Sequence, residues 1–228
     1  MALLEVVAMN EVDAEAAETG GADRIVAVAE RQSGGLSPDP KTVAAMRKTT
    51  SLPIRVMLRA KSGFRTTEPE LARLCRAACA HASAGADGFV FGFLHADGTV
   101  DLSATARLAD AVLPLPWTFH RAIDHAVDPV AAWREMRVLR GLDSVLCAGA
   151  AGGVEPGIDA LVRRAACDAR LMLVGGGLRR RHVAVLAAAG VRAFQVEDAV
   201  RPAAAGQTPV EAVRVREWRA LVDAAAER

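Results

Sequence analysis

The sequence predicts a single (β/α)8 barrel, and three observations support this fold. Short apolar runs rich in Val, Ile, Leu and Phe recur along the chain, and each is followed by a longer stretch with helical spacing. Eight such pairs fit into 228 residues, which is at the small end of the range for this barrel. No linker or charged run divides the chain, so residues 1–228 are expected to form one domain.

Each predicted strand is a short apolar run bounded by turn residues, and each predicted helix follows one strand. In chain order, the strands are expected at Leu3–Ala8, Asp23–Val28, Ile54–Leu58, Gly88–Gly92, Trp117–His120, Ser144–Cys147, Leu171–Val174 and Ala193–Val196. The helices are expected at Glu11–Thr19, Pro40–Lys48, Thr67–Ala84, Ser103–Val112, Pro129–Arg140, Pro156–Ala166, Arg179–Ala189 and Pro209–Glu227.

Turn residues support these boundaries. Gly85 and Gly190 each follow a predicted helix and precede a strand, as a helix C-cap requires. Pro129 stands at a helix start, where its missing N–H costs nothing. The first strand runs into Met9-Asn10 without a glycine-rich fingerprint, which favours the barrel over a doubly wound nucleotide-binding sheet.

Composition excludes several functional classes. The 28 basic and 27 acidic residues nearly cancel, so no basic surface for nucleic acid is expected. The chain has three lysines, Lys41, Lys48 and Lys61, and all three fall on a predicted outer helix or a loop. A Schiff-base aldolase is therefore disfavoured, because its lysine must be held in a desolvated site.

No part of the sequence predicts a membrane or an oxidising compartment. No apolar run approaches the roughly 18 residues that a membrane helix needs. The N-terminal residues lack the basic region and cleavage site of a signal peptide. Four scattered cysteines do not make a disulfide framework. We therefore expect a cytoplasmic protein with no membrane partner.

A histidine is expected at the rim of the barrel mouth, where catalytic residues of this fold lie. In the fifth predicted strand, alternation turns Trp117 and Phe119 toward the helices and leaves Thr118 and His120 facing the barrel axis. A rim histidine can act as an acid, a base or a metal ligand, or can simply be hydrogen-bonded to a neighbour. We predict that His120 is catalytic, with Asp124 either assisting it or pairing locally with an arginine.

Charged side chains are also expected inside the barrel. In the third predicted strand, Arg55 and Arg59 fall on the inner face, and Arg59 at the strand end is suited to clamp an anion. Glu5 on the first strand faces inward too, and a charge buried there needs a partner. For Glu5, a structural ion pair and a catalytic role remain open alternatives.

A run of three glycines follows the seventh predicted strand and opens a helix. Backbone N–H groups at Gly175, Gly176 and Gly177 would favour an anion, and loops after strands seven and eight often bind phosphate in this fold. The same glycines would also suit a tight turn. We predict that Arg59 and these glycines hold a small anion, on which His120 acts as an acid or base.

Metal binding is the other chemistry that the sequence permits. Cys75, Cys79 and His81 point around a predicted helix in different directions, so they are interpreted as packing residues. Cys147 ends the sixth predicted strand and could face His120 across the rim. These two soft ligands define a possible Cu(I) site.

Taken together, these stretches resemble the CutC copper-homeostasis family. The two most specific matches are Gly34-Gly35-Leu36-Ser37-Pro38 and Phe119-His120-Arg121-Ala122 with Asp124 after it. The remaining matches, in order, are Met1-Ala2-Leu3-Leu4-Glu5, Gly21-Ala22-Asp23-Arg24-Ile25, Arg59, Val90-Phe91-Gly92-Phe93-Leu94, Asp97-Gly98-Thr99-Val100-Asp101 and Gly175-Gly176-Gly177.

The resemblance implies a cytoplasmic TIM-type barrel that self-associates and takes part in copper homeostasis. Two functional hypotheses follow. In the first, the protein binds a copper ion, with Cys147 and His120 as candidate ligands. In the second, it is a barrel enzyme of lyase, isomerase or hydrolase type that acts on a small phosphorylated or carboxylated metabolite.

Overall fold

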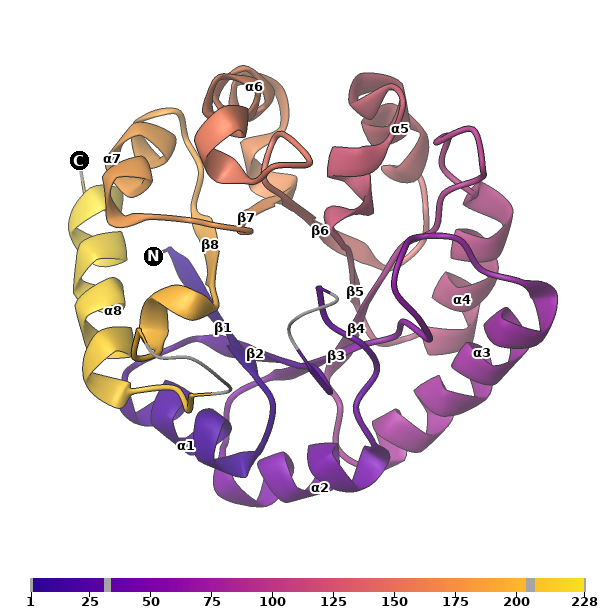
Figure 1. The fold of residues 1–228 in the computed structure, drawn as a ribbon, viewed down its shortest axis with the longest axis horizontal. Coiled ribbons are helices and arrows are strands. Elements are labelled where there is room, and N and C mark those ends of the chain that lie inside the picture. The colour runs from indigo at the N-terminus through magenta and orange to yellow at the C-terminus, as the bar shows by residue number, and fades with distance from the viewer. Residues whose placement is uncertain (1, 31–33, 204–207, 228) are drawn as a thin grey trace.

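A closed ring of eight parallel strands, surrounded by helices, forms the described part of the chain, which comprises residues 2–30, 34–203 and 208–227 of the computed structural model (Figure 1). Each strand pairs with its sequence neighbours, and β1 closes the ring against β8. The strands are β1 (Leu3–Ala8), β2 (Arg24–Ala27), β3 (Ile54–Met57), β4 (Gly88–Phe91), β5 (Trp117–Phe119), β6 (Leu142–Cys147), β7 (Met172–Val174) and β8 (Ala193–Val196). The predicted (β/α)8 barrel is confirmed.

One α-helix follows each strand and packs on the outside of the ring (Figure 1). The helices are α1 (Glu11–Thr19), α2 (Pro40–Thr49), α3 (Glu68–Ser83), α4 (Leu102–Val112), α5 (Pro129–Met136), α6 (Val154–Asp168), α7 (Arg180–Ala188) and α8 (Ala212–Ala226). Short 3-10 helices are inserted at η1 (Arg121–His125), η2 (Ala169–Leu171) and η3 (Asp198–Val200). The last helix, α8, lies between α1 and α7, so the helical layer is closed as well.

The C-terminal helix begins later than the predicted Pro209. Val210 N–H donates to the carboxylate of Asp13 (2.8 Å), and Glu211 N–H donates to the carbonyl of Val200 (2.9 Å). These long-range bonds hold the segment against the barrel before the helix starts, so α8 begins at Ala212.

Large side chains of the strands face outward, as alternation predicts. Trp117 and Phe119 are fully buried between the sheet and the helices, and Trp117 stacks on Phe91 with 4.3 Å between ring centroids. The lumen is therefore lined by smaller or polar side chains, which leaves room for a cavity at the mouth.

Two layers of inward side chains fill the barrel below that mouth. The lower layer is polar and the upper layer is apolar, and Val7, Val26 and Met57 of the upper layer each stand two positions beyond a polar residue of the same strand. The polar layer contains Glu5, Arg24, Arg55, Thr118, Ser144 and Gln195. The apolar layer contains Val7, Val26, Val28, Met57 and Val90. The apolar layer separates the buried charges from the cavity above.

Among the helices that the structure describes, none has the length and apolar character needed to cross a lipid bilayer.

Candidate functional site

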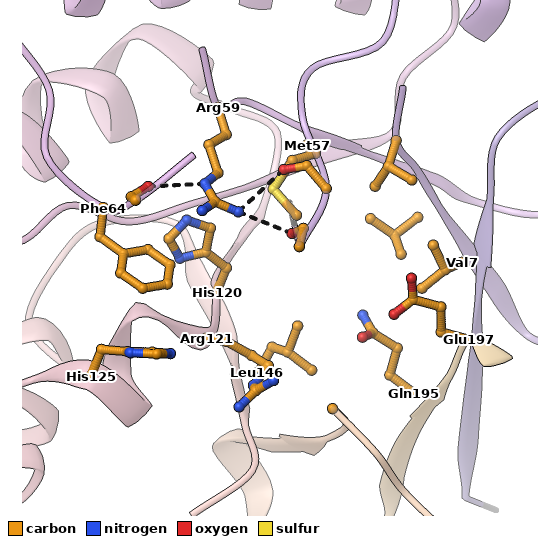
Figure 2. A pocket seen from close by; sticks show the side chains of 16 residues that line it. Val7, Met57, Arg59, Phe64, His120, Arg121, His125, Leu146, Gln195 and Glu197 are labelled. Carbon is orange, nitrogen blue, oxygen red and sulfur yellow. Dashed lines mark hydrogen bonds between the residues drawn. The ribbon is translucent and has the colours of Figure 1, made fainter. Parts of the chain in front are cut away.

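A cavity of about 590 Å³ opens at the C-terminal ends of the strands (Figure 2). Its floor is apolar, and its walls come from the loops after β2 and β3, from η1, and from the ends of β6, β7 and β8. The lining residues are Val7, Val26, Val28, Gly34, Gly35, Met57, Arg59, Gly63, Phe64, His120, Arg121, His125, Leu146, Gly176, Gln195 and Glu197. An apolar pocket with a few converging polar groups at this end of a barrel is the expected form of a ligand site.

Two arginines, Arg59 and Arg121, line the cavity, and Arg59 is the more deeply buried, at 8% exposed. Its guanidinium donates to the carbonyls of Gly34 (3.1 Å), Gly35 (3.4 Å) and Gly63 (3.1 Å), so it joins the loops after β2 and β3. It also lies 4.9 Å from the ring centroid of Phe64. Burial lowers the pKa of Arg59, but arginine stays protonated in proteins. The cavity therefore has a fixed positive charge on one side.

The second glycine of Gly34-Gly35-Leu36-Ser37-Pro38 is required by the backbone geometry and by its close neighbours. Gly35 has a φ of +87°, and a Cβ there would lie 3.0 Å from Val28 and 3.3 Å from Met57. Ser37 Oγ then accepts the N–H of Arg59 at 2.8 Å. The Gly-Gly-Leu-Ser-Pro stretch thus holds Arg59 in place.

His120 lies beside Arg59 and is 3% exposed, as the sequence predicted for an inward rim residue. Its Nδ1 accepts the N–H of Ala122 at 3.3 Å, which assigns the proton of the neutral ring to Nε2. The ring packs edge-on against Phe64, with 5.3 Å between centroids. Burial, followed by the charge of Arg59, lowers the pKa of His120 to about 3. His120 is therefore a neutral hydrogen-bond donor at neutral pH.

Sequence reasoning missed several residues of the wall. His125 packs on Phe64 at 4.8 Å, and it lies in η1, which was not predicted. Gln195 on β8 and Glu197, the residue after the end of β8, lie on the side of the cavity away from Arg59 (Figure 2). Strand alternation could have found these two, because every second residue of β8 faces the lumen.

Glu5 does not line the cavity. Its carboxylate accepts the Nε–H of Arg24 at 2.5 Å and the side-chain N–H of Gln195 at 2.7 Å, and it is fully buried in the polar layer. Of the two alternatives for Glu5, the structural ion pair describes this position.

Asp124 lies behind the cavity wall rather than on it. Its carboxylate accepts N–H groups of Ala148 (2.9 Å) and Gly149 (2.9 Å) and the Nε–H of Arg121 (3.0 Å). Burial raises the pKa of Asp124, and these hydrogen bonds oppose the shift. Asp124 thus positions the loop after β6 and the guanidinium of Arg121.

The helix after the glycine run begins within one residue of the predicted Arg179, so the three glycines lie in the loop before it. Helix α7 begins at Arg180, and the N–H of Arg179 donates to His182 Nδ1 at 3.1 Å. Of the run, Gly176 lines the cavity, where a Cβ would lie 2.7 Å from the guanidinium of Arg121, while Gly175 and Gly177 do not line it. Arg59 and Gly176 thus line the same cavity from strands β3 and β7, which lie across the ring from each other.

The predicted Cys147–His120 copper pair is wrong in its geometry. Leu146 faces the cavity, so the next residue, Cys147, faces the helices, where it lines a separate hollow with Trp133 and Leu161. Burial raises the pKa of the Cys147 thiol far above its usual range, which disfavours the thiolate that binds metals. Within the described ranges, no three His, Cys, Asp or Glu side chains are grouped to hold a metal ion.

Comparison with solved structures supports the fold. A CutC protein from Streptococcus agalactiae, for which a role in copper homeostasis has been suggested, superposes with a TM-score of 0.77 at 21% identity, covering 86% of this chain and 98% of that chain. Phosphoribosyl anthranilate isomerase from Thermococcus kodakaraensis superposes with a TM-score of 0.67 at 17% identity, covering 97% of this chain and 99% of that chain. At these identities the likeness concerns the fold alone.

Sequence comparison is more specific. A CutC family protein from Klebsiella pneumoniae strain 342 is 36% identical over 194 residues, covering 84% of this chain and 78% of that protein. One from Xanthomonas axonopodis is 36% identical over 189 residues, covering 80% of this chain and 77% of that protein. The sequence profile of the CutC family matches residues 2–199. The chain therefore belongs to the CutC family.

Proposed function

We propose that the protein binds a small organic anion, a carboxylated or phosphorylated metabolite, in the cavity at the barrel mouth. The observation that carries this proposal is the buried guanidinium of Arg59 beside a neutral His120, above an apolar floor. Arginine presents a planar set of donors that matches carboxylate and phosphate groups. His120 adds a neutral N–H donor, and the apolar floor suits a hydrocarbon part.

Preorganisation supports this role. Arg59 is held by carbonyl groups of two loops, so the guanidinium is positioned before a ligand arrives. Carbonyl oxygens orient the group without removing its formal charge, although Glu30 also acts on Arg59 electrostatically. A donor that is already fixed loses less conformational entropy on binding than a flexible one.

Catalysis on the bound anion is a second candidate, favoured by the fixed tautomer of His120. A neutral Nε2–H beside Arg59 can polarise a carbonyl or phosphoryl oxygen and stabilise the negative charge that develops on it. His120 would act through this hydrogen bond, because a pKa of about 3 leaves little imidazolium to serve as an acid near pH 7. The role proposed for His120 is therefore that of a hydrogen-bond donor, which is narrower than the acid or base role that the sequence suggested.

The cavity fits a copper ion less well. The thiol of Cys147 lies on the far side of the sheet from His120. The positive charge of Arg59 beside His120 would also repel a cation in a partly desolvated site. The residues present thus fit an anion better than a copper ion.

Ligand titration of an arginine variant tests the anion proposal. Butanoate, hexanoate, octanoate and phenyl phosphate would be titrated into wild-type protein, Arg59→Gln, Arg59→Lys and the exposed control Arg216→Gln, and followed by NMR chemical shifts. We expect at least one probe to bind wild type and the control equally, and to bind Arg59→Gln about tenfold more weakly, because a charge-assisted hydrogen bond is lost.

Arg59→Lys keeps the positive charge, so we expect it to bind the anionic probe more tightly than Arg59→Gln does. Binding by Arg59→Lys would also show that a variant at this position folds. Absence of binding to wild type, or equal binding to a folded Arg59→Gln variant, would overturn the proposal.

We also propose that the protein works in the cytoplasm. All four cysteines are free thiols, and Cys79 and Cys167 are exposed, which is typical of a reducing compartment. Cell fractionation checks this location, and recovery in a membrane or secreted fraction would contradict it.

A further inference from the structure

A second hollow lies on the outside of the barrel, between α5 and α6. Its volume is about 390 Å³, and small-molecule sites occupy about 300–1,000 Å³. Its wall includes Val130 and Trp133 of α5, Cys147 of β6, and Leu161, Arg163 and Arg164 of α6. Among the described residues, this hollow and the cavity at the barrel mouth share no lining residue, so they are separate places for a ligand.

The two helices explain why the hollow exists. Helix α5 has 8 residues, whereas α6 has 15. Helix α6 packs closely on α7 but only loosely on α5, so the helical layer is open at this point (Figure 1). Residues three and four apart share one face of a helix, and α6 turns such a stripe toward the opening. The stripe contains Ala160, Arg163, Arg164 and Cys167.

The inner wall of the hollow is apolar. Ile123, Trp133 and Leu161 line it and belong to the core between the sheet and the helices. Cys147 lines it from the sheet, and burial raises the pKa of its thiol, so the thiol stays neutral. A neutral buried thiol behaves as a small apolar group. The inner wall therefore suits the hydrocarbon part of a ligand.

Two arginines of α6 give the hollow its positive charge. Within residues 2–30, 34–203 and 208–227, neither Arg163 nor Arg164 forms an ion pair with a carboxylate. Asp124 also lines the hollow, but its carboxylate already holds the Nε–H of Arg121 and two backbone N–H groups. The carboxylate of Asp128, nearby, is fully exposed and caps the start of α5. Two cations and one carboxylate thus line the hollow, which favours a ligand with a single negative charge.

Arg164 is positioned before any ligand arrives. Its guanidinium carbon lies 4.9 Å from the ring centroid of Trp133. Trp133 is 2% exposed, and its indole N–H donates to Asp168 at 3.1 Å, so the ring itself is fixed. Packing on an aromatic face keeps the charge of a guanidinium and leaves the N–H groups at its edge available. Arg164 therefore offers fixed donors at the opening, next to the more exposed Arg163.

We propose that this hollow is a second ligand site, which takes a small apolar monocarboxylate. The hydrocarbon part of the ligand lies on the inner wall, and its carboxylate accepts hydrogen bonds from Arg164 and Arg163. A guanidinium matches the planar geometry of a carboxylate, and the hydrogen bonds are strengthened by both charges. This site is independent of the anion-binding function proposed for the barrel mouth.

Matched probes test the second site. Naphthalene-2-carboxylate, cyclohexanecarboxylate and 4-phenylbutanoate would each be compared with the uncharged primary amide of the same skeleton. Binding would be followed by the NMR signal of the indole N–H of Trp133, which lines the hollow. The indole signals of Trp117 and Trp218, which lie outside both cavities, serve as internal references.

Two pairs of variants separate the effect of charge from that of shape. Arg164→Gln removes the fixed cation, and Arg170→Gln removes an exposed arginine outside the hollow. Ala160→Leu fills part of the hollow, while Ala166→Leu adds the same group at an exposed position of α6. Both leucine variants should keep the helix, because leucine is a good helix former.

In wild type and the two control variants, we expect at least one carboxylate to shift the Trp133 signal and to bind about tenfold more tightly than its amide. Arg164→Gln should weaken this binding about tenfold because a charge-assisted hydrogen bond is lost. Ala160→Leu should weaken it about tenfold because the added methyl groups occupy the volume.

Several results would overturn the second site. These are the absence of any probe that shifts the Trp133 signal, equal binding of acid and amide, and wild-type affinity in Arg164→Gln or Ala160→Leu. Arg59→Gln, which removes a cation of the barrel mouth, identifies probes that bind there instead. If Arg59→Gln weakens binding and Arg164→Gln does not, the probes occupy the mouth, so the second site fails while the proposed function stands.

Discussion

His120 shows how burial decides what a single side chain can do. An exposed histidine titrates near pH 6.5, but this ring sits between Arg59 and Phe64 with almost no contact with solvent. Protonation would place a second positive charge in the same desolvated region, so the neutral ring is favoured. The neutral form also agrees with its contact to Ala122, where Nδ1 accepts a hydrogen bond.

This state of His120 predicts a pH dependence of stability. The pKa is about 3 when folded and near its ordinary 6.5 when unfolded, so below pH 6.5 the unfolded state binds the proton and the folded state does not. The contribution of His120 to the free energy of unfolding is complete above pH 6.5, falls as pH decreases, and is lost near pH 3. Between pH 6.5 and about 5 the loss should be about 2 kcal/mol.

Urea denaturation at several pH values checks this prediction. His120→Asn is the matched variant, because its side-chain oxygen can accept the N–H of Ala122 but cannot titrate. We expect the wild-type free energy of unfolding to fall by about 2 kcal/mol more than that of His120→Asn over this interval. Parallel pH profiles for the two proteins would show that His120 is protonated in the folded state.

For single residues, the most informative feature of the sequence was the alternation that turns successive side chains of a strand toward the lumen or toward the helices. Alternation correctly placed Thr118 and His120 inward and Trp117 outward. The same rule, applied to β6 from the inward Ser144, would have turned Cys147 toward the helices. The predicted copper pair was wrong because it considered only that Cys147 ends its strand, and not that alternation turns its side chain toward the helices.

At the scale of elements, a buried ion pair joins the two ends of the chain. The guanidinium of Arg201 donates to both carboxylate oxygens of Asp13 (2.8 and 3.2 Å) and to the carbonyl of Val7 (2.9 Å). Asp13 also accepts the N–H of Val210. This cluster fixes the start of α1 relative to the segment before α8, and both side chains of the pair are almost fully buried.

Removing Arg201 should therefore be costly. Arg201→Met leaves the Asp13 carboxylate buried without its cation, so we expect the free energy of unfolding to decrease by about 3–5 kcal/mol. Adding Asp13→Asn should recover part of this loss, because the buried charge is then gone. Urea denaturation measures both effects.

The matched control is Arg214→Met, which removes an exposed partner of Glu211 and should cost less than about 1 kcal/mol. An Arg201→Met variant as stable as the control would mean that the buried pair contributes no stability.

The existence of helices and strands was predictable, while the conformation of connections was less so. Periodicity identified every β/α pair because each helix has one buried face. For Gly175, Gly176 and Gly177 the sequence left an anion site and a tight turn open, because glycine suits several backbone conformations and the sequence alone does not say which group receives their N–H groups. In the structure, Gly175 donates to the carbonyl of Cys147 and the carbonyl of Gly176 accepts from Val154.

At the scale of the whole molecule, the polar layer helps to close the barrel. Glu5 on β1 contacts Arg24 on β2 and Gln195 on β8, so one carboxylate links three adjacent strands across the point of closure. A buried charge of this kind is tolerated because both of its oxygens have partners.

This position predicts that Glu5 affects stability rather than ligand binding. Glu5→Gln leaves Arg24 buried without its carboxylate, so the free energy of unfolding should decrease by about 3–5 kcal/mol. Monocarboxylate affinity should stay within about twofold of wild type, because Glu5 lies below the apolar floor. Urea denaturation and NMR titration under folding conditions measure the two effects. Normal stability with loss of binding would instead support the catalytic alternative for Glu5.

The sequence by itself determined the fold, because eight repeats of an apolar strand and an amphipathic helix bury their apolar faces in few other arrangements. It also determined that Arg59 and His120 face the mouth, since alternation is a local property of a strand. Only the tertiary structure decided which of the inward polar groups meet one another, because such pairs join residues as distant as Glu5 and Gln195. Burial in that closed ring lowered the pKa of His120, and closure of the ring brought Glu197 and Arg59 to the same cavity.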